Sequence, residues 1–236
     1  MLIRLLIKIL ECLPPQISKH MVGVAVNAVL KKYAKIQVEG YENIESAEKP
    51  VIFISNHLSN ADGLVLNKVL EKEDATFVSG VKLSNNSFTR LGVLAVKTTP
   101  IVPNSPDKDG IKKIVGILKS GNSIVVFPEG TRSRNGSMIQ AKSGILLLQR
   151  LSKATVIPIG LSGTEMLMPI NDENMGKEKF HQAVVTVKIG EPVQVPNKEK
   201  EETKKDYEER VLNQLMISIA ALLPEKYRGV YGTYID

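Results

Sequence analysis

From residue 50 to the C-terminus, short runs of β-branched residues alternate with stretches of helical period, and this alternation constrains the fold more than any other feature. The runs are almost continuously apolar, as in residues 51–55, and do not alternate apolar with polar residues. Strands of that kind are buried on both faces, which is typical of a parallel sheet covered by helices. The sequence therefore predicts an α/β fold with a mainly parallel central sheet and flanking helices.

The boundaries of the expected elements follow from this pattern. The predicted strands are 51–55, 76–79, the extended pieces 94–97 and 100–102, then 123–127, 155–159 and 183–189. The predicted helices are 63–71, 107–120, about 140–151 and about 202–223. Gly121 should end the second helix, because glycine readily adopts the left-handed conformation found after helices. The chain has 236 residues, of which 43% are apolar, and can therefore build a core of useful size.

The first 40 residues are predicted to form a separate helical hairpin. Residues 1–10 are typical of an amphipathic helix, with Arg4 and Lys8 four positions apart and apolar residues covering most of the remainder. Two prolines at 14 and 15 end this helix, and a second helical period covers about 17–33. We therefore expect an N-terminal hairpin over 1–40 and an α/β domain over 41–236.

Charge indicates that this hairpin docks on a membrane surface. The first 40 residues carry six basic and two acidic side chains, and the whole chain carries 31 and 25. Basic amphipathic helices bind anionic lipid at the interface. No apolar run reaches the roughly 18 residues that a spanning helix needs. We expect a peripheral or monotopic protein at the cytoplasmic face of the cell membrane. The alternative is an ordinary helical hairpin that packs on the domain and touches no lipid.

Composition and missing motifs exclude several classes of function. Tryptophan is absent and aromatic residues make up 5% of the chain, which argues against a nucleic-acid partner. The single cysteine, Cys12, cannot form an internal disulfide or a cysteine-based metal site, and no metal is expected. Zinc-protease, phosphate-loop and dinucleotide motifs are missing. The segment 160–164 lacks the last glycine of a serine nucleophile elbow, so we expect no covalent serine mechanism.

A histidine and an aspartate follow the first strand of the domain. His57 and Asp62 are five residues apart in the turn between strand 51–55 and the next helix. A carboxylate beside an imidazole fixes its tautomer and stabilises the imidazolium, so this pair could remove a proton from a hydroxyl. Backbone N–H groups of residues 57–63 are candidate oxyanion donors. The alternative is that Asp62 is only a helix N-cap and His57 a buried structural residue.

A second polar loop follows strand 123–127 and has the composition of a phosphate site. Gly130 permits close backbone approach, and Arg132 supplies a forked donor for a phosphate oxyanion. Glu129 would repel phosphate, and is expected to orient an arginine or hold a substrate hydroxyl. Lys142 could add positive charge to the same pocket or could be an ordinary surface lysine. The alternative for the whole loop is an exposed polar turn.

The two clusters together resemble the motifs of the glycerolipid acyltransferases, most closely the bacterial 1-acyl-sn-glycerol-3-phosphate acyltransferase (PlsC) family. The similar segments are Asn56-His57-x-Ser59-x-x-Asp62, Phe127-Pro128-Glu129-Gly130-Thr131-Arg132-Ser133-Arg134, Lys142-x-Gly144 and Val156-Ile157-Pro158-Ile159. The resemblance covers about residues 50–165. It implies an α/β domain preceded by a two-helix membrane-docking motif.

The resemblance also implies a reaction and roles for the matching residues. His57 is the expected base and Asp62 its orienting partner. The expected substrate-binding residues are Glu129, Gly130, Thr131, Arg132, Asn56, Ser59 and Lys142. The expected reaction moves an acyl chain from an acyl-carrier protein or coenzyme A thioester to the hydroxyl of lysophosphatidic acid, giving phosphatidic acid in phospholipid synthesis. No cofactor beyond the thioester co-substrate is implied.

One region departs from the family pattern. Between the two motifs the family usually has Gly, a short apolar strand and then Arg, whereas residues 92–103 contain no arginine. Lys97 or Arg90 is the candidate substitute, and lysine lacks the bidentate fork of arginine. Glycerol 3-phosphate or another lysophospholipid is therefore an alternative acceptor. A peripheral protein that only binds anionic lipid, without catalysis, is the alternative of another class.

Overall fold

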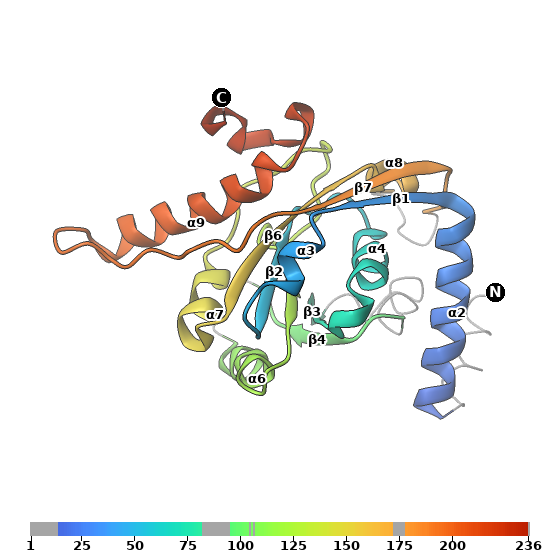
Figure 1. Cartoon of the computed structure of the whole chain (residues 1–236), viewed down its shortest axis with the longest axis horizontal. Helices are drawn as coiled ribbons and strands as arrows, with labels where there is room; N and C mark the ends of the chain where they lie inside the picture. The colour runs from blue at the N-terminus through green and yellow to red at the C-terminus, as the bar shows by residue number, and fades with distance from the viewer. Residues whose placement is uncertain (1–13, 82–94, 104, 106, 172–177, 236) are drawn as a thin grey trace.

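A computed structural model of the chain describes residues 14–81, 95–103, 105, 107–171 and 178–235 (Figure 1). Its strands are β1 (Ala34–Glu39), β2 (Val51–Ser55), β3 (Thr76–Gly80), β4 (Thr98–Ile101), β5 (Ile124–Val126), β6 (Thr155–Ser162) and β7 (Ala183–Ile189). Its α-helices are α2 (Pro15–Tyr33), α3 (Glu42–Glu45), α4 (Asp62–Val69), α6 (Lys108–Lys119), α7 (Gly144–Ser152), α8 (Thr164–Leu167) and α9 (Lys204–Ala221). Short 3-10 helices cover Glu71–Glu73, Glu225–Tyr227 and Gly229–Tyr234.

Within the described residues these strands form a single sheet in the order β1-β7-β6-β2-β5-β3-β4. Neighbouring strands are parallel except β6 and β7, which are antiparallel. The central strand β2 pairs with β5 on one side and β6 on the other. All five of its residues are buried, as the continuous apolar run predicts. The prediction of a mainly parallel central sheet is confirmed.

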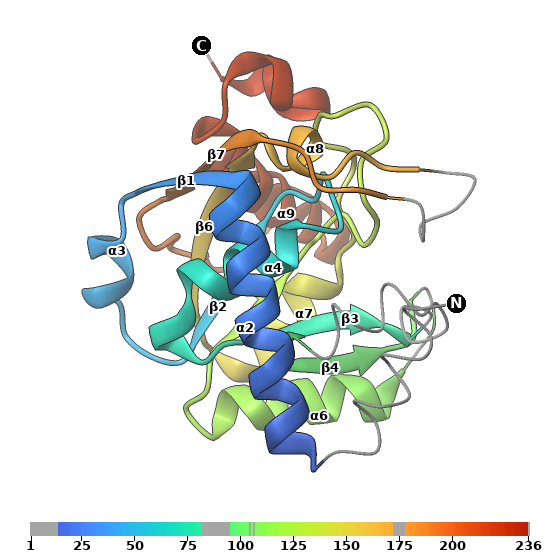
Figure 2. The same cartoon turned by 90° about the vertical axis from the view of Figure 1, so that its right-hand side faces the viewer.

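The side chains of the sheet divide between two cores, one on each face. Ile52 and Ile54 of β2 belong to the core beneath α6, α7 and α9. Val51 and Phe53 belong to the other core, with residues of α2, α3, α4 and α8. Successive strand residues point to opposite faces, so the continuous apolar run fills both cores at once. Figures 1 and 2 show the two helical layers on either side of the sheet.

Most predicted elements are confirmed within a few residues, and α6 ends just before Gly121, whose φ is +86°. Two predictions need correction. The helix expected from about residue 140 begins at Gly144, because the N–H groups of Ala141 and Lys142 donate to Tyr231 and to Pro128 instead of to a helical turn. The extended piece 94–97 is not a strand where it is described, and β4 begins at Thr98.

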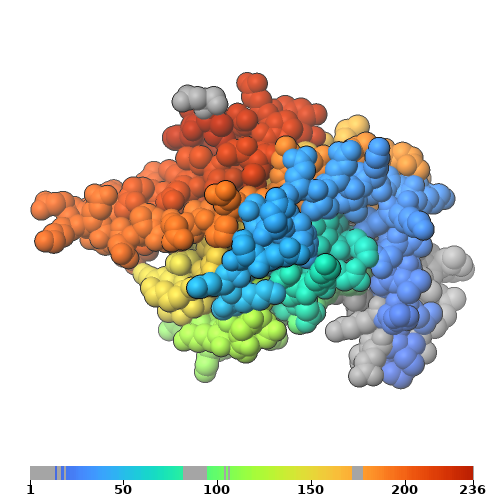
Figure 3. All heavy atoms as spheres, in the orientation of Figure 1, coloured from blue at the N-terminus to red at the C-terminus, as the bar shows by residue number. Residues whose placement is uncertain are grey.

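The N-terminal segment agrees with the predicted hairpin in part. Residues 1–10 lie outside the described part of the chain, whereas α2 occupies the second predicted helix. Residues 34–39, assigned to the hairpin segment by sequence, form β1 and pair in parallel with β7, so they belong to the sheet. The atoms of α2, β1 and α3 run across one face of the molecule (Figure 3).

Apolar side chains lie exposed on α2. Val22 and Leu30 are buried against the domain, but Ile17, Met21 and Val24 are each about half exposed. Among the described helices, none is long and apolar enough to cross a membrane.

We predict that Phe53→Ala destabilises the protein by about 3–5 kcal/mol, because Phe53 is fully buried in the central strand and its removal leaves a cavity. Val24→Ala, on the exposed face of α2, should change the free energy of unfolding by no more than about 0.5 kcal/mol. Urea unfolding followed by circular dichroism measures both. Equal effects of the two substitutions would contradict the placement of the core.

Candidate active site

The two polar loops of the sequence analysis lie side by side at the carboxyl edge of the sheet. They follow β2 and β5, which are adjacent parallel strands and therefore end at the same edge. The N–H of Ser133 in the second loop donates to the carbonyl of His57 in the first, at 2.7 Å. The two clusters therefore lie next to each other at one edge of the sheet.

His57 and Asp62 form the expected pair. The imidazole Nδ1 lies 2.7 Å from Oδ2 of Asp62, whose side chain is fully buried, while the His57 side chain is 20% exposed. A carboxylate can only accept hydrogen bonds, so Nδ1 carries the proton and Nε2 is the nitrogen that can take up another. The pair therefore has the arrangement of an oriented general base.

Asp62 does not act as a helix N-cap. Its Oδ2 accepts the backbone N–H groups of Leu58 at 2.7 Å and Ser59 at 2.9 Å, which precede the helix. The carboxylate thus folds the turn back onto itself while it holds the imidazole. The N–H groups of residues 57, 58, 59, 61 and 62 donate within the protein, so among the candidate oxyanion donors of residues 57–63 only those of residues 60 and 63 stay a prediction.

Residues of the second loop contact both the ring and the backbone of His57. The imidazole ring of His57 stacks on Phe127, with the ring centroids 4.1 Å apart and the planes at 16°. The backbone N–H of His57 donates to Oε1 of Glu129 at 2.8 Å. Together with the bond from Ser133 to its carbonyl, these contacts fix the backbone and the ring plane of the histidine. Sequence reasoning missed Phe127 as a site residue, although it directly precedes the predicted loop.

Glu129 has a different role from the one expected. Its two carboxylate oxygens accept the N–H groups of His57 and, at 2.9 Å, of Ile139, and the residue is buried. It therefore ties the histidine to the far end of its own loop, and the structure shows it neither pairing with Arg132 nor facing outward. Burial raises the pKa of Glu129 to about 7, with a further raising effect from Asp62, while the two N–H donors favour the charged form.

The cationic side chains stand around this loop. Lys142 passes close beside Gly130, whose added Cβ would meet the lysine Cδ at 3.1 Å, and its N–H donates to Pro128. Arg132 is 19% exposed, and its Nη1 donates to Glu178 at 3.0 Å. Thr131 is exposed at the tip of the loop. Gly130, Thr131, Arg132 and Lys142 thus all lie in the segment between β5 and α7, and their role in binding a phosphate stays a prediction.

Asn56 and Ser59 stabilise the loops, which corrects their expected role as substrate contacts. Both are fully buried. The amide of Asn56 exchanges two hydrogen bonds with the backbone of Leu161 in β6, at 2.9 and 2.8 Å. The hydroxyl of Ser59 donates to the carbonyl of Met168 at 2.7 Å. They anchor the first loop to its neighbours.

Lys97 is excluded as the substitute for the missing arginine. It directly precedes β4, at the amino edge of the sheet and opposite the two loops, and it pairs with Asp74. Arg90, the other candidate, lies outside the described residues.

The C-terminal segment is hydrogen-bonded to the end of the second loop. The N–H of Met138 donates to the carbonyl of Tyr227, and the hydroxyl of Tyr231 accepts the N–H of Ala141. Gly229 has a φ of +51° and lies so close to Met138 that an added Cβ would overlap its carbonyl oxygen. These contacts brace both sides of Ile139, which in turn holds Glu129. They join residues some 90 positions apart, so no local sequence signal could have indicated them.

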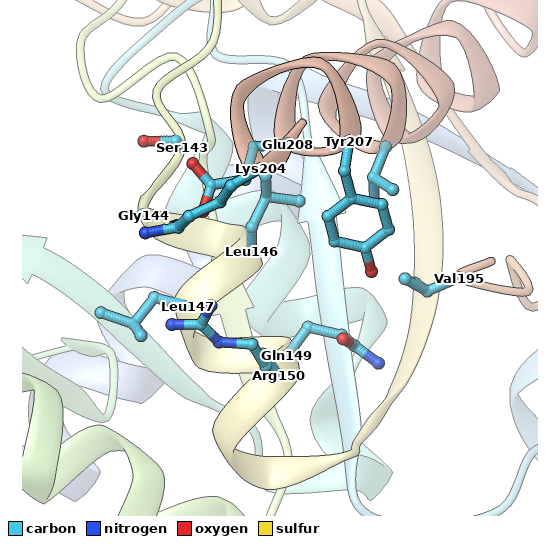
Figure 4. A pocket seen from close by; sticks show the side chains of 11 residues that line it. Ser143, Gly144, Leu146, Leu147, Gln149, Arg150, Val195, Lys204, Tyr207 and Glu208 are labelled. Carbon is cyan, nitrogen blue, oxygen red and sulfur yellow. Dashed lines mark ion pairs between the residues drawn. The ribbon is translucent and has the colours of Figure 1, made fainter. Parts of the chain in front are cut away.

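A cavity of about 240 Å³ lies elsewhere, between α7 and α9. Figure 4 shows Lys204 and Tyr207 of α9 facing Leu146 and Arg150 of α7. None of the predicted site residues lines it, and it contains no histidine, so we place the chemistry in the loops and not in this cavity. Within the described residues no group of three or more His, Cys, Asp or Glu side chains could hold a metal ion.

Comparison with known proteins gives the family. The sequence profile of the family described as Acyltransferase matches residues 35–162, which is more than half of the chain and contains both loops. The chain belongs to the acyltransferase family. The resemblance stated from the sequence motifs is thereby confirmed.

Several relatives are 1-acyl-sn-glycerol-3-phosphate acyltransferases. The chloroplastic enzyme of Arabidopsis thaliana is 32% identical over 146 residues, covering 61% of this chain and 40% of the relative. The protein of that name from Bacillus subtilis is 22% identical, covering 72% and 79%. The chain spans about two fifths of the length of the chloroplastic relatives from Arabidopsis thaliana and Brassica napus. The crystal structure of PlsC from Thermotoga maritima has the same fold, with a TM-score of 0.58, 19% identity and coverage of 90% and 85%.

The raised pKa of Glu129 predicts a pH-dependent stability. Below pH 4.5 the carboxyl is protonated in both the folded and the unfolded chain, and between pH 4.5 and about 7 only the unfolded chain ionises. As the pH rises from 4.5 to about 7, the free energy of unfolding of the wild-type protein should therefore fall by about 3 kcal/mol relative to that of Glu129→Gln. Urea unfolding of both proteins at several pH values measures it, and a constant difference would contradict the raised pKa.

Proposed function

We propose that this protein is an acyltransferase that moves an acyl chain from a thioester to the free hydroxyl of 1-acyl-glycerol 3-phosphate, giving phosphatidic acid. The single observation that carries this proposal is the 2.7 Å contact between Nδ1 of His57 and Oδ2 of Asp62, beside a loop that bears Arg132. A base and an anion-binding group on joined loops suit an acceptor that carries both a hydroxyl and a phosphate. The names of the relatives support the same reaction.

The reaction needs no covalent enzyme intermediate. Nε2 of His57 takes the proton from the acceptor hydroxyl as its oxygen attacks the thioester carbonyl carbon. A C–O bond forms, and the carbonyl oxygen becomes the oxyanion of a tetrahedral intermediate. The intermediate then collapses: the C=O bond re-forms, the C–S bond breaks, and the departing thiolate takes up the proton that His57 holds. Asp62 stabilises the imidazolium between these two steps.

The donor is either an acyl-carrier protein or a coenzyme A thioester. A thiolate is a good leaving group, because an ordinary thiol such as that of cysteine has a pKa of only about 8.5, so neither donor needs a second strong acid. The imidazolium of His57 is therefore sufficient as the proton source. The proposal is the same for both donors.

The acceptor is held through its phosphate by Arg132 and Lys142 at the Gly130 turn. A phosphate monoester carries about −1.5 to −2 charges at neutral pH, which two cationic groups nearly balance. Both residues belong to the segment between β5 and α7, whose first part contacts His57, so the hydroxyl of a short glycerol phosphate can reach the neighbouring histidine. Lysophosphatidic acid is the acceptor named for the relatives, and glycerol 3-phosphate has the same polar chemistry.

The protein works at the cytoplasmic face of the cell membrane, attached from one side through its N-terminal segment. The exposed Ile17, Met21 and Val24 of α2, together with Lys31 and Lys32 in its last turn, support this placement. An acceptor with an acyl chain resides in the bilayer, so a membrane-bound enzyme meets it without extracting it first.

An assay that crosses two thioester donors with several acceptors tests the proposal. Lysophosphatidic acid, glycerol 3-phosphate and lysophosphatidylcholine are offered with acyl-coenzyme A and with acyl-carrier protein. Transfer to lysophosphatidic acid with at least one donor is expected. If no acceptor is acylated by either donor, the protein is better described as a lipid-binding member of the family without catalysis.

We predict that His57→Ala lowers kcat by at least about 10²- to 10⁴-fold, because the hydroxyl loses its general base. The exposed His181→Ala is the matched control and should leave the turnover unchanged. Circular dichroism checks that both variants are folded. A folded His57→Ala with normal turnover would exclude the base role.

We predict that Arg132→Ala raises KM for the phosphorylated acceptor by about 10- to 100-fold, the effect of losing one charge-assisted hydrogen-bonding group. KM for the thioester should stay within about twofold. Arg210→Ala, which removes an arginine paired with Glu202 at the start of α9, serves as control. A larger effect on the donor than on the acceptor would refute the assignment.

A further inference from the structure

A buried acid outside both motifs joins the two loops of the site. Glu178 lies in the segment between α8 and β7, and its side chain is fully inaccessible to solvent. Its Oε1 accepts Nη1 of Arg132 at 3.0 Å and the N–H of Asn171 at 3.2 Å. Its Oε2 accepts Nδ2 of Asn60 at 2.7 Å. One carboxylate therefore contacts both the loop after β2 and the loop after β5.

The electrostatics of this acid favour a fixed position for Arg132. A buried carboxylate is costly unless donors surround it, so the guanidinium, the amide and the N–H are held where they compensate its charge. A guanidinium has five N–H donors in a fixed planar arrangement, and Glu178 accepts one of them at Nη1. The arginine side chain is partly exposed, whereas the acid lies beneath it, so the negative charge faces the protein interior.

The same acid links Arg132 to the turn that carries His57. Asn60 belongs to the turn that Asp62 closes around His57, and Arg132 directly precedes Ser133, which bonds to the carbonyl of His57. Only a few covalent bonds join the phosphate of a glycerol phosphate to its free hydroxyl, so the two groups can lie only a limited distance apart. A rigid link between the arginine and the histidine turn would therefore matter for binding the acceptor in a reactive position.

We propose that Glu178 is a positioning residue that holds the Arg132 guanidinium in the orientation that binds the acceptor phosphate. The inference rests on the proposed function, because it assigns Arg132 to the phosphate. Glu178 acts through Arg132, whereas Asn60 holds the carboxylate itself in place, and Glu178 does not touch the substrate. Its absence from both motifs explains why spacing in the sequence could not indicate it.

Glu178→Gln tests this role, since it removes the charge and nearly preserves the shape. KM for lysophosphatidic acid should rise by roughly 3- to 10-fold. This factor corresponds to the cost of immobilising the Arg132 side chain when the acceptor binds, once Glu178 no longer holds it in place. KM for the thioester and kcat should change by less than about twofold. Glu202→Gln, which breaks another arginine–glutamate pair at the start of α9, is the matched control and should leave both KM values unchanged.

The decisive comparison is made in the Arg132→Ala background. If Glu178 acts through the arginine, Glu178→Gln should have no further effect on kcat/KM for the acceptor there. A general loosening of the fold would instead lower activity equally in both backgrounds, and that result overturns the inference. An unchanged or lower acceptor KM in the single variant also overturns it, because the carboxylate would then only compete with the phosphate.

A second variant keeps the test decisive if Glu178→Gln does not fold. Asn60→Ala removes the donor to Oε2 while the buried charge remains, and circular dichroism reports whether each variant has the wild-type fold. Asn60→Ala should raise KM for lysophosphatidic acid as Glu178→Gln does, and it should have no such effect in the Arg132→Ala background. A folded Asn60→Ala variant with an unchanged acceptor KM overturns the inference. Failure of the proposed function is distinct, since the wild-type protein would then acylate no acceptor.

Discussion

One oxygen atom, Oδ2 of Asp62, organises the catalytic turn. It accepts Nδ1 of His57 and the N–H groups of Leu58 and Ser59, so the same atom closes the turn and orients the imidazole. The side chain is fully buried, and such a charge is stable only with several donors around it. The turn cannot open without leaving the carboxylate uncompensated, which couples the local fold to the position of the base.

The second loop completes this arrangement because β2 and β5 are parallel neighbours. Their carboxyl ends place His57 against Phe127, Glu129 and Ser133, which hold its ring, its N–H and its carbonyl. Glu129, which sequence reasoning assigned to the substrate, serves the histidine instead. The acid that pairs with Arg132 is Glu178, which belongs to neither motif, and not Glu129 as the sequence analysis expected. Two buried acids, Glu129 and Glu178, thus connect the loops, whereas Arg132 is partly exposed and Lys142 is exposed.

The chain brings distant segments to this edge of the sheet. The C-terminal 3-10 helices hold residues 138–141, and these residues hold Glu129 through Ile139. At the other end of the described chain, α2 packs beside β1 and α4 and exposes apolar side chains. In the proposed function a site built for a lipid acceptor and a surface suited to a bilayer belong to one molecule, because the acceptor dissolves in the membrane and not in water.

The sequence by itself determined the class of fold and most of the strands, and it singled out His57 and Asp62 as a candidate pair. Continuous apolar runs must be buried on both faces, and a five-residue spacing after a strand lets a carboxylate return to an imidazole, so both signals are local. The strand β1 was not foreseen, because its half-exposed edge lacks the continuous apolar run of the central strands.

Only the tertiary structure decided what the other polar residues do. Asn56 meets Leu161 across 105 positions and Glu178 meets Arg132 across 46, so composition alone could not separate a substrate contact from a structural one. The physical reason is that a buried polar group must find its partner wherever the fold places one. Spacing along the chain reports on turns and faces, whereas hydrogen-bond partners between distant loops depend on which strands become neighbours.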